Sequence, residues 1–237
     1  MKRGVKVSHN VIRRLPRYLR KLDELTEAGV SRISSGELGR QLGLTPSQIR
    51  QDFSCFGEFG QQGYGYKVTA LRAEIASILG MDRGFKAILI GVGNIGQALV
   101  CNFSFNQWGF ELMAAFDVKP ELVGNEHDGI MVHHIDELPQ FLDENHVDVA
   151  VLCVPKKHAV AITELLTSHG INAIWNFTNV ELTAPESSTI VENIHFSDSL
   201  LSLSYFVAQD IDEKAARAAR PYSPLLLPRR ASTHGAE

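Results

Sequence analysis

The segment Gly91-Val92-Gly93-Asn94-Ile95-Gly96 constrains the fold of this chain more than any other. It follows an apolar stretch, residues 86–90, that is typical of a strand buried in a parallel sheet, and it precedes a predicted helix. In this context the first glycine permits a tight turn, the second lets a pyrophosphate approach the backbone, and the third lets helix and strand pack closely. The spacing therefore predicts an α/β fold that binds a dinucleotide at a helix N-terminus.

A carboxylate at the expected distance supports this prediction. Residues 110–116 predict a second strand, and Asp117 follows it, 21 residues beyond Gly96. A carboxylate there can accept hydrogen bonds from the adenosine ribose and would repel a 2′-phosphate, so NAD(H) is favoured over NADP(H). Coenzyme A or another nucleotide-like ligand on the same fold stays open as an alternative.

Further strands are predicted at residues 147–154, 171–177 and 191–196, with a helix at residues 157–169. Polar and aromatic side chains follow these strands at their carboxyl ends, where an open α/β sheet lines its cofactor crevice. We therefore predict a Rossmann-like domain over residues 85–197. Its predicted cofactor-binding residues are Gly91, Val92, Gly93, Asn94, Ile95, Gly96, Asp117, Pro155, Asn176, Phe177 and Phe196.

Charge divides the chain into two unlike parts. Residues 1–84 contain 14 Lys and Arg against 8 Asp and Glu, whereas the remainder contains 9 basic and 19 acidic residues. Such asymmetry predicts a basic module for a polyanion, joined to an acidic module with another task.

Helix signals in the basic part predict a helix-turn-helix. Residues 17–28 predict an amphipathic helix with Pro16 in its first turn and Gly29 at its end. Two capping boxes, residues 34–37 and 45–48, then begin a helix through Leu42 and a second helix to about Phe56. The outer face of this second helix carries small, hydrogen-bonding side chains and one guanidinium that could bridge guanine O6 and N7. A solvated face of a structural helix would look similar.

The segment over residues 57–67 is rich in glycine and aromatic residues and predicts a β-hairpin wing. Thr69 is expected to cap a helix that ends at Gly80, and residues 81–84 form a linker. We therefore predict a winged-helix DNA-binding domain over residues 1–80. Its predicted DNA contacts are Arg14, Arg17, Ser47, Gln48, Arg50, Gln51, Ser54, Gln61, Gln62, Tyr64 and Lys67.

The C-terminal part predicts a helix that is apolar at its start, assigned to residues 198–220, and residues 221–237 are expected to be disordered because they hold three prolines and no periodic pattern. No apolar run reaches the length of a membrane span, and the basic N-terminus lacks the apolar core of a secretory signal. Three cysteines, at widely separated positions, match neither a metal site nor a disulfide framework. We expect a cytoplasmic protein.

Candidate catalytic groups are few. His133 and His134 are adjacent by chance, His195 falls in a predicted strand, and the cluster Lys156, Lys157 and His158 is the best enzymatic candidate. No histidine forms a recognisable pair with a nucleophile or acid, and we predict neither a catalytic residue nor a metal site. The cofactor is interpreted as a signal, with an NAD-dependent oxidoreductase carrying a fused basic domain as the alternative.

Several of these segments resemble the redox-sensing transcriptional repressors of the Rex family, over about residues 8–207. They are residues 14–18, 34–39, 47–53, 56–66, 91–96, 116–118, 175–177 and 191–193. The resemblance implies a homodimer that exchanges its C-terminal helix, which packs near the partner's DNA-binding domain. It also implies an operator in double-stranded DNA, release by NADH but not NAD⁺, and control of genes for NADH reoxidation. Some members carry an acidic residue where this chain has His195 and an aromatic residue near Asn102, so a switch built on those groups would differ here.

Overall fold

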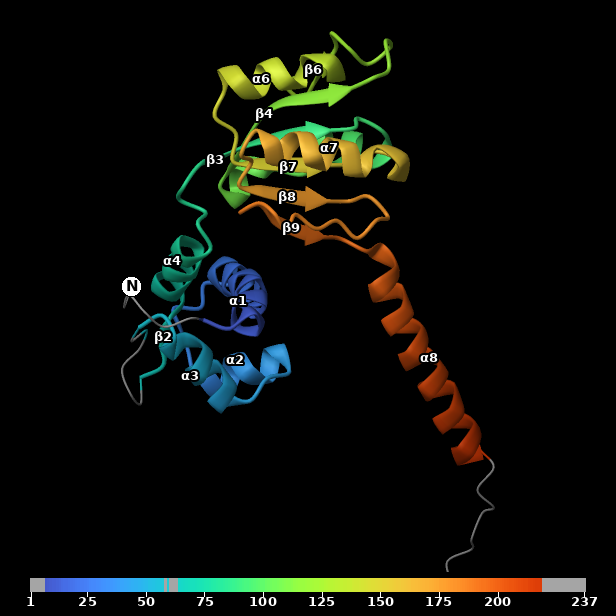
Figure 1. The fold of residues 1–237 in the computed structure, drawn as a ribbon. Coiled ribbons are helices and arrows are strands. Elements are labelled where there is room, and N and C mark those ends of the chain that lie inside the picture. Colours follow the sequence, from blue (N-terminus) through green and yellow to red (C-terminus); the bar gives the residue numbers. More distant parts are fainter. Residues whose placement is uncertain (1–6, 58, 60–63, 219–237) are drawn as a thin grey trace, which may run out of the picture. The chain divides into compact units, whose positions relative to one another are not determined.

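The computed structural model describes residues 7–57, 59 and 64–218. The chain divides into two compact units, Met1–Asn193 and Ile194–Glu237. The first unit contains a helical N-terminal part and a sheet with flanking helices, and the second contains the C-terminal helix (Figure 1).

The first helix, α1 (His9–Glu27), is longer than predicted. The Ser8 hydroxyl accepts a hydrogen bond from the Val11 N–H at 3.4 Å and caps α1, which begins at His9, eight residues before Arg17. Pro16 therefore lies inside α1 and not in its first turn. Its ring removes one intrahelical hydrogen bond, and the burial of Val11 and Leu15 on the preceding turns offsets that loss.

The next two helices confirm the predicted helix-turn-helix. They are α2 (Ser35–Leu42) and α3 (Pro46–Ser54). The Ser34 hydroxyl accepts from the Glu37 N–H at 3.0 Å, and the Thr45 hydroxyl accepts from the Gln48 N–H at 3.2 Å. Both predicted N-caps are therefore present.

The wing differs from a simple hairpin. Its return strand, β2 (Tyr66–Lys67), pairs antiparallel with β1 (Arg32–Ile33), a strand between α1 and α2 that was not predicted. Gly65 has a φ of +69°, and a Cβ there would lie 2.6 Å from the Ile33 carbonyl oxygen, so this approach requires glycine. Residues 58 and 60–63 of the predicted wing lie outside the described residues. Helix α4 (Val68–Ile78) begins at Val68, so Thr69 lies within it and does not cap it.

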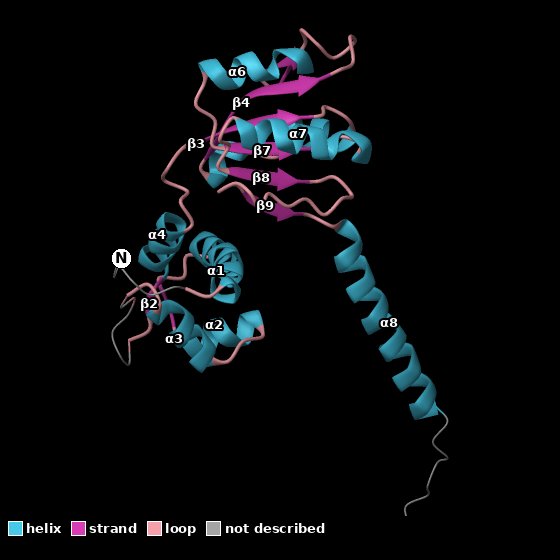
Figure 2. Ribbon diagram, in the orientation of Figure 1, coloured by secondary structure: helices cyan, strands magenta, loops and turns pink. Residues whose placement is uncertain are grey.

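The sheet confirms the Rossmann-like α/β fold. It has seven strands in the order β5-β6-β4-β3-β7-β8-β9, all parallel except β5 (Figure 2). Their bounds are β3 (Phe85–Ile90), β4 (Phe110–Asp117), β5 (Glu126–His127), β6 (Ile130–His134), β7 (Val149–Leu152), β8 (Ala173–Asn176) and β9 (Ile190–Asn193). The helices are α5 (Asn94–Asn102), α6 (Leu138–Glu144) and α7 (Lys156–Ser168). β5, β6 and α6 were not predicted.

One predicted strand is wrong at its C-terminal end. Residues 191–196 were expected to form a strand, but β9 ends at Asn193 and Phe196 begins α8 (Phe196–Ala218). The Asp198 N–H bonds the His195 carbonyl at 3.2 Å, and Asp198 lies in the first helical turn, where a carboxylate is favourable. His195 is therefore in the connection between β9 and α8.

The second unit exposes many large apolar side chains along α8: Phe196, Leu200, Leu201, Leu203, Tyr205, Phe206, Val207 and Ile211. None of the described helices is long and apolar enough to cross a membrane. The tail expected to be disordered, residues 221–237, lies outside the described residues.

Candidate functional site

The glycine-rich loop joins β3 to α5, as its spacing predicts. Gly91 has a φ of +95°, and a Cβ there would lie 2.7 Å from the Cys153 carbonyl oxygen. A Cβ on Gly96 would collide with the Gly91 carbonyl oxygen, so both glycines are required by the protein's own packing. A Cβ on Gly93 would meet open space. Gly93 thus leaves the backbone at the start of α5 accessible, where the N–H groups of the first turn lack intrahelical acceptors.

Asp117 fixes this loop and remains able to bind a ligand. Its carboxylate is 8% exposed; one oxygen accepts from the Val92 N–H at 2.7 Å and the other from the Lys119 N–H at 2.9 Å. A carboxylate oxygen can accept two hydrogen bonds, so each retains capacity for a ribose hydroxyl.

A cleft of about 690 Å³ opens beside this loop. It brings together seven of the predicted cofactor residues, which are Gly91, Gly93, Asn94, Ile95, Asp117, Pro155 and Phe177. Val92 contributes through its bond to Asp117, Gly96 through packing, and Phe196 belongs to α8 in the second unit. Lining residues that the sequence analysis did not assign to the cofactor include Val118, Lys119, Lys156, His158, Thr178 and Asn179. Of these, Lys156 and His158 belong to the cluster named above as the enzymatic candidate, and the other four could be found only by their positions at the carboxyl ends of strands.

Asn176 has a structural set of partners. Its side chain is fully buried; the Nδ2 group donates to the Val180 carbonyl at 2.8 Å and to Asn193 Oδ1 at 2.7 Å. Its Oδ1 accepts from the Thr178 N–H at 2.9 Å and from the Thr178 hydroxyl at 2.7 Å. These bonds use the full capacity of the amide, and Asn176 is not among the residues that line the cleft. Its predicted contact with the cofactor stays a prediction.

The chemistry of the cleft is suited to binding. Burial raises the pKa of the Cys153 thiol to about 12, so this sulfur is protonated at neutral pH and a poor nucleophile. Lys156 and His158 are exposed in the first turn of α7. Within the described part of the chain, no group of three or more His, Cys, Asp or Glu residues is placed to hold a metal ion.

The outer face of α3 presents the side chains predicted to read DNA. Ser47, Arg50, Gln51 and Ser54 are exposed, and the Arg50 guanidinium donates to the Ser35 hydroxyl at 3.1 Å. Lys67 and Tyr64 are exposed near the wing, with Tyr64 at 70%. Arg17 is exposed and donates to the Leu42 carbonyl at 3.0 Å. Gln61 and Gln62 lie outside the described residues.

Arg14 and Gln48 have an internal partner, Asp52. The Arg14 guanidinium donates to the two Asp52 oxygens at 2.6 and 2.8 Å, the Tyr18 hydroxyl donates at 2.5 Å, and the Gln48 amide donates at 2.8 Å. Burial of Asp52 opposes its ionisation, but the hydrogen bonds from Arg14, Tyr18 and Gln48 outweigh it and hold the pKa of Asp52 below its usual value. DNA contacts by Arg14 and Gln48 stay predictions; in the structure Arg14 joins α1 to α3 through Asp52, and Gln48 holds the Asp52 carboxylate within α3.

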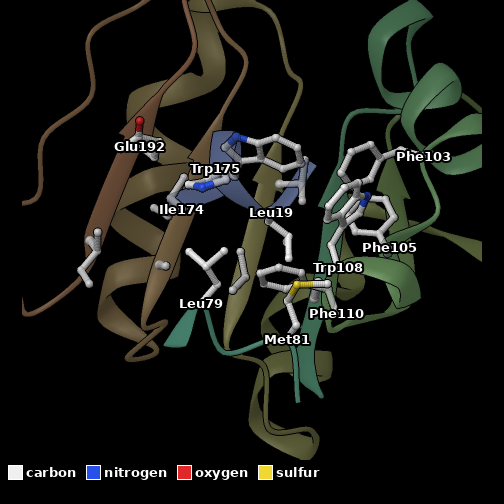
Figure 3. Close-up of a pocket in the computed structure, with 16 residues that line it drawn as sticks. Leu19, Leu79, Met81, Phe103, Phe105, Trp108, Phe110, Ile174, Trp175 and Glu192 are labelled. Carbon is white, nitrogen blue, oxygen red and sulfur yellow. The ribbon is translucent and has the colours of Figure 1, made fainter. Parts of the chain in front are cut away.

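The first unit also contains an apolar cavity of about 390 Å³ that was not predicted from the sequence (Figure 3). Leu19 of α1 and Leu79 and Met81 after α4 contribute to its wall. An aromatic group completes it, consisting of Phe103, Phe105, Trp108, Phe110 and Trp175. At its rim Glu192 of β9 pairs with Arg13 of α1 at 3.5 Å. The aromatic density of residues 103–110 was the available signal.

Comparisons with known proteins agree with this two-part organisation. A family model described as "CoA binding domain" matches residues 82–180, and one described as "Putative DNA-binding protein N-terminus" matches residues 6–54. The chain is 48% identical to the redox-sensing transcriptional repressor Rex of Clostridium acetobutylicum, over 84% of this chain and 92% of that protein. It is also 48% identical to Rex of Clostridium tetani, over 85% and 95% of the two chains.

Solved structures give the same result. The structure of RSP in complex with β-NAD⁺ and operator DNA matches with a TM-score of 0.81 and 43% identity, over 91% of this chain and 99% of that one. RSP is a Rex-family repressor. Its structure in complex with β-NADH matches with a TM-score of 0.82 and 41% identity, over 90% of this chain and 100% of that one. The resemblance inferred from the sequence is confirmed. This chain belongs to the family of redox-sensing transcriptional repressors Rex.

Proposed function

We propose that this protein represses transcription by binding operator DNA, and that NADH binding releases it from the DNA. The observation that carries the proposal is that one chain holds a helix-turn-helix with an exposed polar face on α3 and a cleft built from Gly93 and Asp117. Relatives solved with operator DNA and β-NAD⁺, or with β-NADH, support the same pair of ligands. The expected targets are genes for NADH reoxidation.

The residues of the cleft fit NAD(H) better than coenzyme A. Gly93 leaves room for a pyrophosphate, and Asp117 lines the same cleft with oxygens that can accept from a ribose diol. Coenzyme A carries a phosphate on its ribose, and the Asp117 carboxylate would repel it. The description of the matched family model as a CoA binding domain thus reports the fold, and we assign this cleft to NAD(H).

A redox signal requires different affinities for the two forms of the cofactor. The oxidised nicotinamide ring is cationic, whereas the dihydronicotinamide ring is neutral. An apolar wall disfavours an unpaired buried cation, and Phe177, which is 8% exposed, lies in that wall. We assign the discrimination to Phe177, with Phe196 of α8 as the second candidate. Phe177→Ala should lower the ratio of NADH to NAD⁺ affinity, and an unchanged ratio would remove Phe177 as the discriminating residue. Phe196→Ala tests the second candidate in the same way.

We propose that the protein acts as a homodimer whose α8 helices are exchanged. The exposed apolar side chains of α8 require cover, and the cavity of Figure 3 is apolar and large enough for side chains of a helix. We assign the partner's α8 to this cavity. Leu203→Asp should convert the dimer to monomer in light scattering, whereas Val160→Asp, at an exposed apolar residue of α7, should leave it dimeric. A dimeric Leu203→Asp variant would contradict the assignment.

We propose that NAD(H) is an effector and that the chain is not an enzyme, because its relatives are named transcriptional repressors. We expect it in the cytoplasm, because the proposed function requires access to DNA.

The decisive measurement is binding to a pool of random DNA duplexes at fixed salt, without cofactor and with NAD⁺, NADH or coenzyme A. Selected binding that NADH abolishes and NAD⁺ preserves is the expected result. Binding that ignores both dinucleotides would overturn the proposal, and turnover of NADH would favour an oxidoreductase.

A further inference from the structure

Two amides, one buried and one half-buried, lie between the cofactor cleft and the start of α8 in the chain. Asn176 is the last residue of β8 and Asn193 the last residue of β9, and the two residues are register partners in the parallel ladder. Their side chains are joined directly, because Asn176 Nδ2 donates to Asn193 Oδ1 at 2.7 Å. Neither residue lines the cleft.

Both amides are also bonded to the loop that follows β8. Asn176 binds the backbone and hydroxyl of Thr178 and the carbonyl of Val180. Asn193 Oδ1 accepts from the Leu182 N–H at 3.1 Å, and its Nδ2 donates to the Leu182 carbonyl at 3.0 Å and to Glu181 Oε1 at 3.1 Å. Each amide therefore has two donated and two accepted bonds, which leaves no spare capacity.

This loop, residues 177–182, lines the cleft with its first residues and is bonded to the amide pair along its length. Phe177, Thr178 and Asn179 line the cleft, and Thr178 is 3% exposed. From Asn193 the chain passes through two residues, Ile194 and His195, into α8 (Figure 1). A shift of the cleft-lining residues must either break bonds of the amide pair or move Asn193 with them. Buried networks with every bond made resist partial rearrangement, because an unpaired buried amide is costly.

We propose that Asn176 and Asn193 are positioning residues that transmit the occupancy of the cofactor cleft to α8. The inference rests on the proposed function and deepens it, since it names the groups that couple the NADH site to the helix of the dimer. It requires no contact between either asparagine and NADH.

Coupling is measured as the factor by which saturating NADH weakens operator binding, and the same factor must describe the effect of DNA on NADH affinity. In Asn193→Ala, the affinity for NADH without DNA and the affinity for DNA without NADH should each remain within about threefold of the parent protein, while the coupling factor falls about tenfold. Asn193 is only half-buried, so water can reach the groups that the substitution leaves unpaired.

Asn172→Ala is the matched control. Asn172 is exposed just before β8, at the opposite end of the strand from Asn176, and donates one bond to Asp148 at 3.2 Å. Its coupling factor should equal that of the parent. If Asn193→Ala does not fold, Asn193→Asp has nearly the same shape and can keep the accepted bonds, but it replaces the donated bonds to Leu182 and Glu181 by repulsion between oxygens. Its coupling factor is held to the same criterion.

The outcomes distinguish failure of the proposed function from failure of the role proposed for the amide pair. A parent protein whose DNA binding ignores NADH would remove the proposed function itself. A responsive parent with an unchanged coupling factor in the Asn193 variant would overturn the role of the amide pair alone. A loss of NADH affinity or DNA affinity in proportion to the loss of coupling would also overturn the role of the amide pair. Such a loss would show that Asn193 contributes only to the structure of the binding sites.

Discussion

The Arg14 guanidinium donates both of its hydrogen bonds to the Asp52 carboxylate, at 2.6 and 2.8 Å, and so fastens α1 to α3. The Asp52 side chain is fully buried and that of Arg14 is 22% exposed. The position of the exposed face of α3, which is predicted to read DNA, therefore depends on an ion pair that the same helix makes with α1.

Replacement of Asp52 by Asn should lower the free energy of unfolding by about 3 kcal/mol, because it leaves a largely buried guanidinium without its counter-charge. The control is Asp23→Asn, which breaks the more exposed pair with Arg72 at 2.8 Å and should cost less than about 1 kcal/mol. Urea denaturation of both variants measures the difference. Equal losses would show that burial of the Arg14–Asp52 pair has no special weight.

The same pair predicts a pH dependence. Because the pKa of Asp52 is lower in the folded protein than in the unfolded chain, its contribution is complete above the unfolded value, about 3.9, and is lost as the pH falls through the folded value. The difference in unfolding free energy between the parent and Asp52→Asn should be constant between about pH 5 and 7 and shrink below about pH 4. A difference that grows on acidification would contradict this sign.

Two glycines of the loop should respond differently to alanine. Gly93→Ala should keep stability within about 0.5 kcal/mol, because its Cβ meets open space, and should weaken NADH binding at least about tenfold by blocking the pyrophosphate. Gly96→Ala should destabilise the fold by about 2 kcal/mol, because its Cβ meets the Gly91 carbonyl. Calorimetric titration and thermal unfolding of each variant test the contrast. Normal NADH affinity in a folded Gly93→Ala protein would place the pyrophosphate elsewhere.

On the DNA side, Arg50→Ala should cost about 1–3 kcal/mol of operator affinity and relax base preference, as expected of a bidentate guanine contact. Lys67→Ala should weaken binding to operator and random DNA alike and reduce the salt slope by about one. Competition binding at several salt concentrations distinguishes the two. If Arg50→Ala reduces both kinds of binding equally, Arg50 does not read bases.

The cysteines give a prediction independent of ligands. Cys101 is exposed on α5 and should be alkylated by iodoacetamide at pH 8, whereas Cys153 should remain unmodified because burial raises its pKa to about 12. Peptide mass spectrometry locates the label, and unfolded protein, in which both should react, is the control. Fast labelling of Cys153 in the folded state would show that the cleft opens wider in solution than it does in this structure.

Features governed by local chemistry were predictable from the sequence. The caps at Ser34 and Thr45 need only residues three positions apart, and the glycine loop with Asp117 needs only one strand-helix-strand segment. Reliance on local signals also explains why the predicted start of the first helix, at Pro16, was wrong. A proline favours the first turn of a helix, but Ser8 caps α1 earlier, and the buried face formed by Val11 and Leu15 extends past the proline.

Features that depend on distant partners were not predictable. β1 has two residues, and its partner in β2 lies more than thirty residues away in the chain. β5 is the polar dipeptide Glu126–His127, and β6 (Ile130–His134) has three apolar residues followed by two histidines, so neither shows the alternation that marks a strand. Polar residues at strand ends were read as ligand contacts, but the amide of Asn176 is bonded to Thr178, Val180 and Asn193, which only the folded loop brings together.

The exposed apolar side chains of α8 also bear on how the stability of the protein depends on its concentration. If that surface is covered only by a second chain, part of the stability of each subunit is a free energy of association, and the midpoint of thermal unfolding must rise with protein concentration. Dilution would then favour unfolded or aggregating chains even when every internal contact of the sheet is intact. The abundance of the protein in a cell would set how much of it is folded, and hence how much is able to reach DNA.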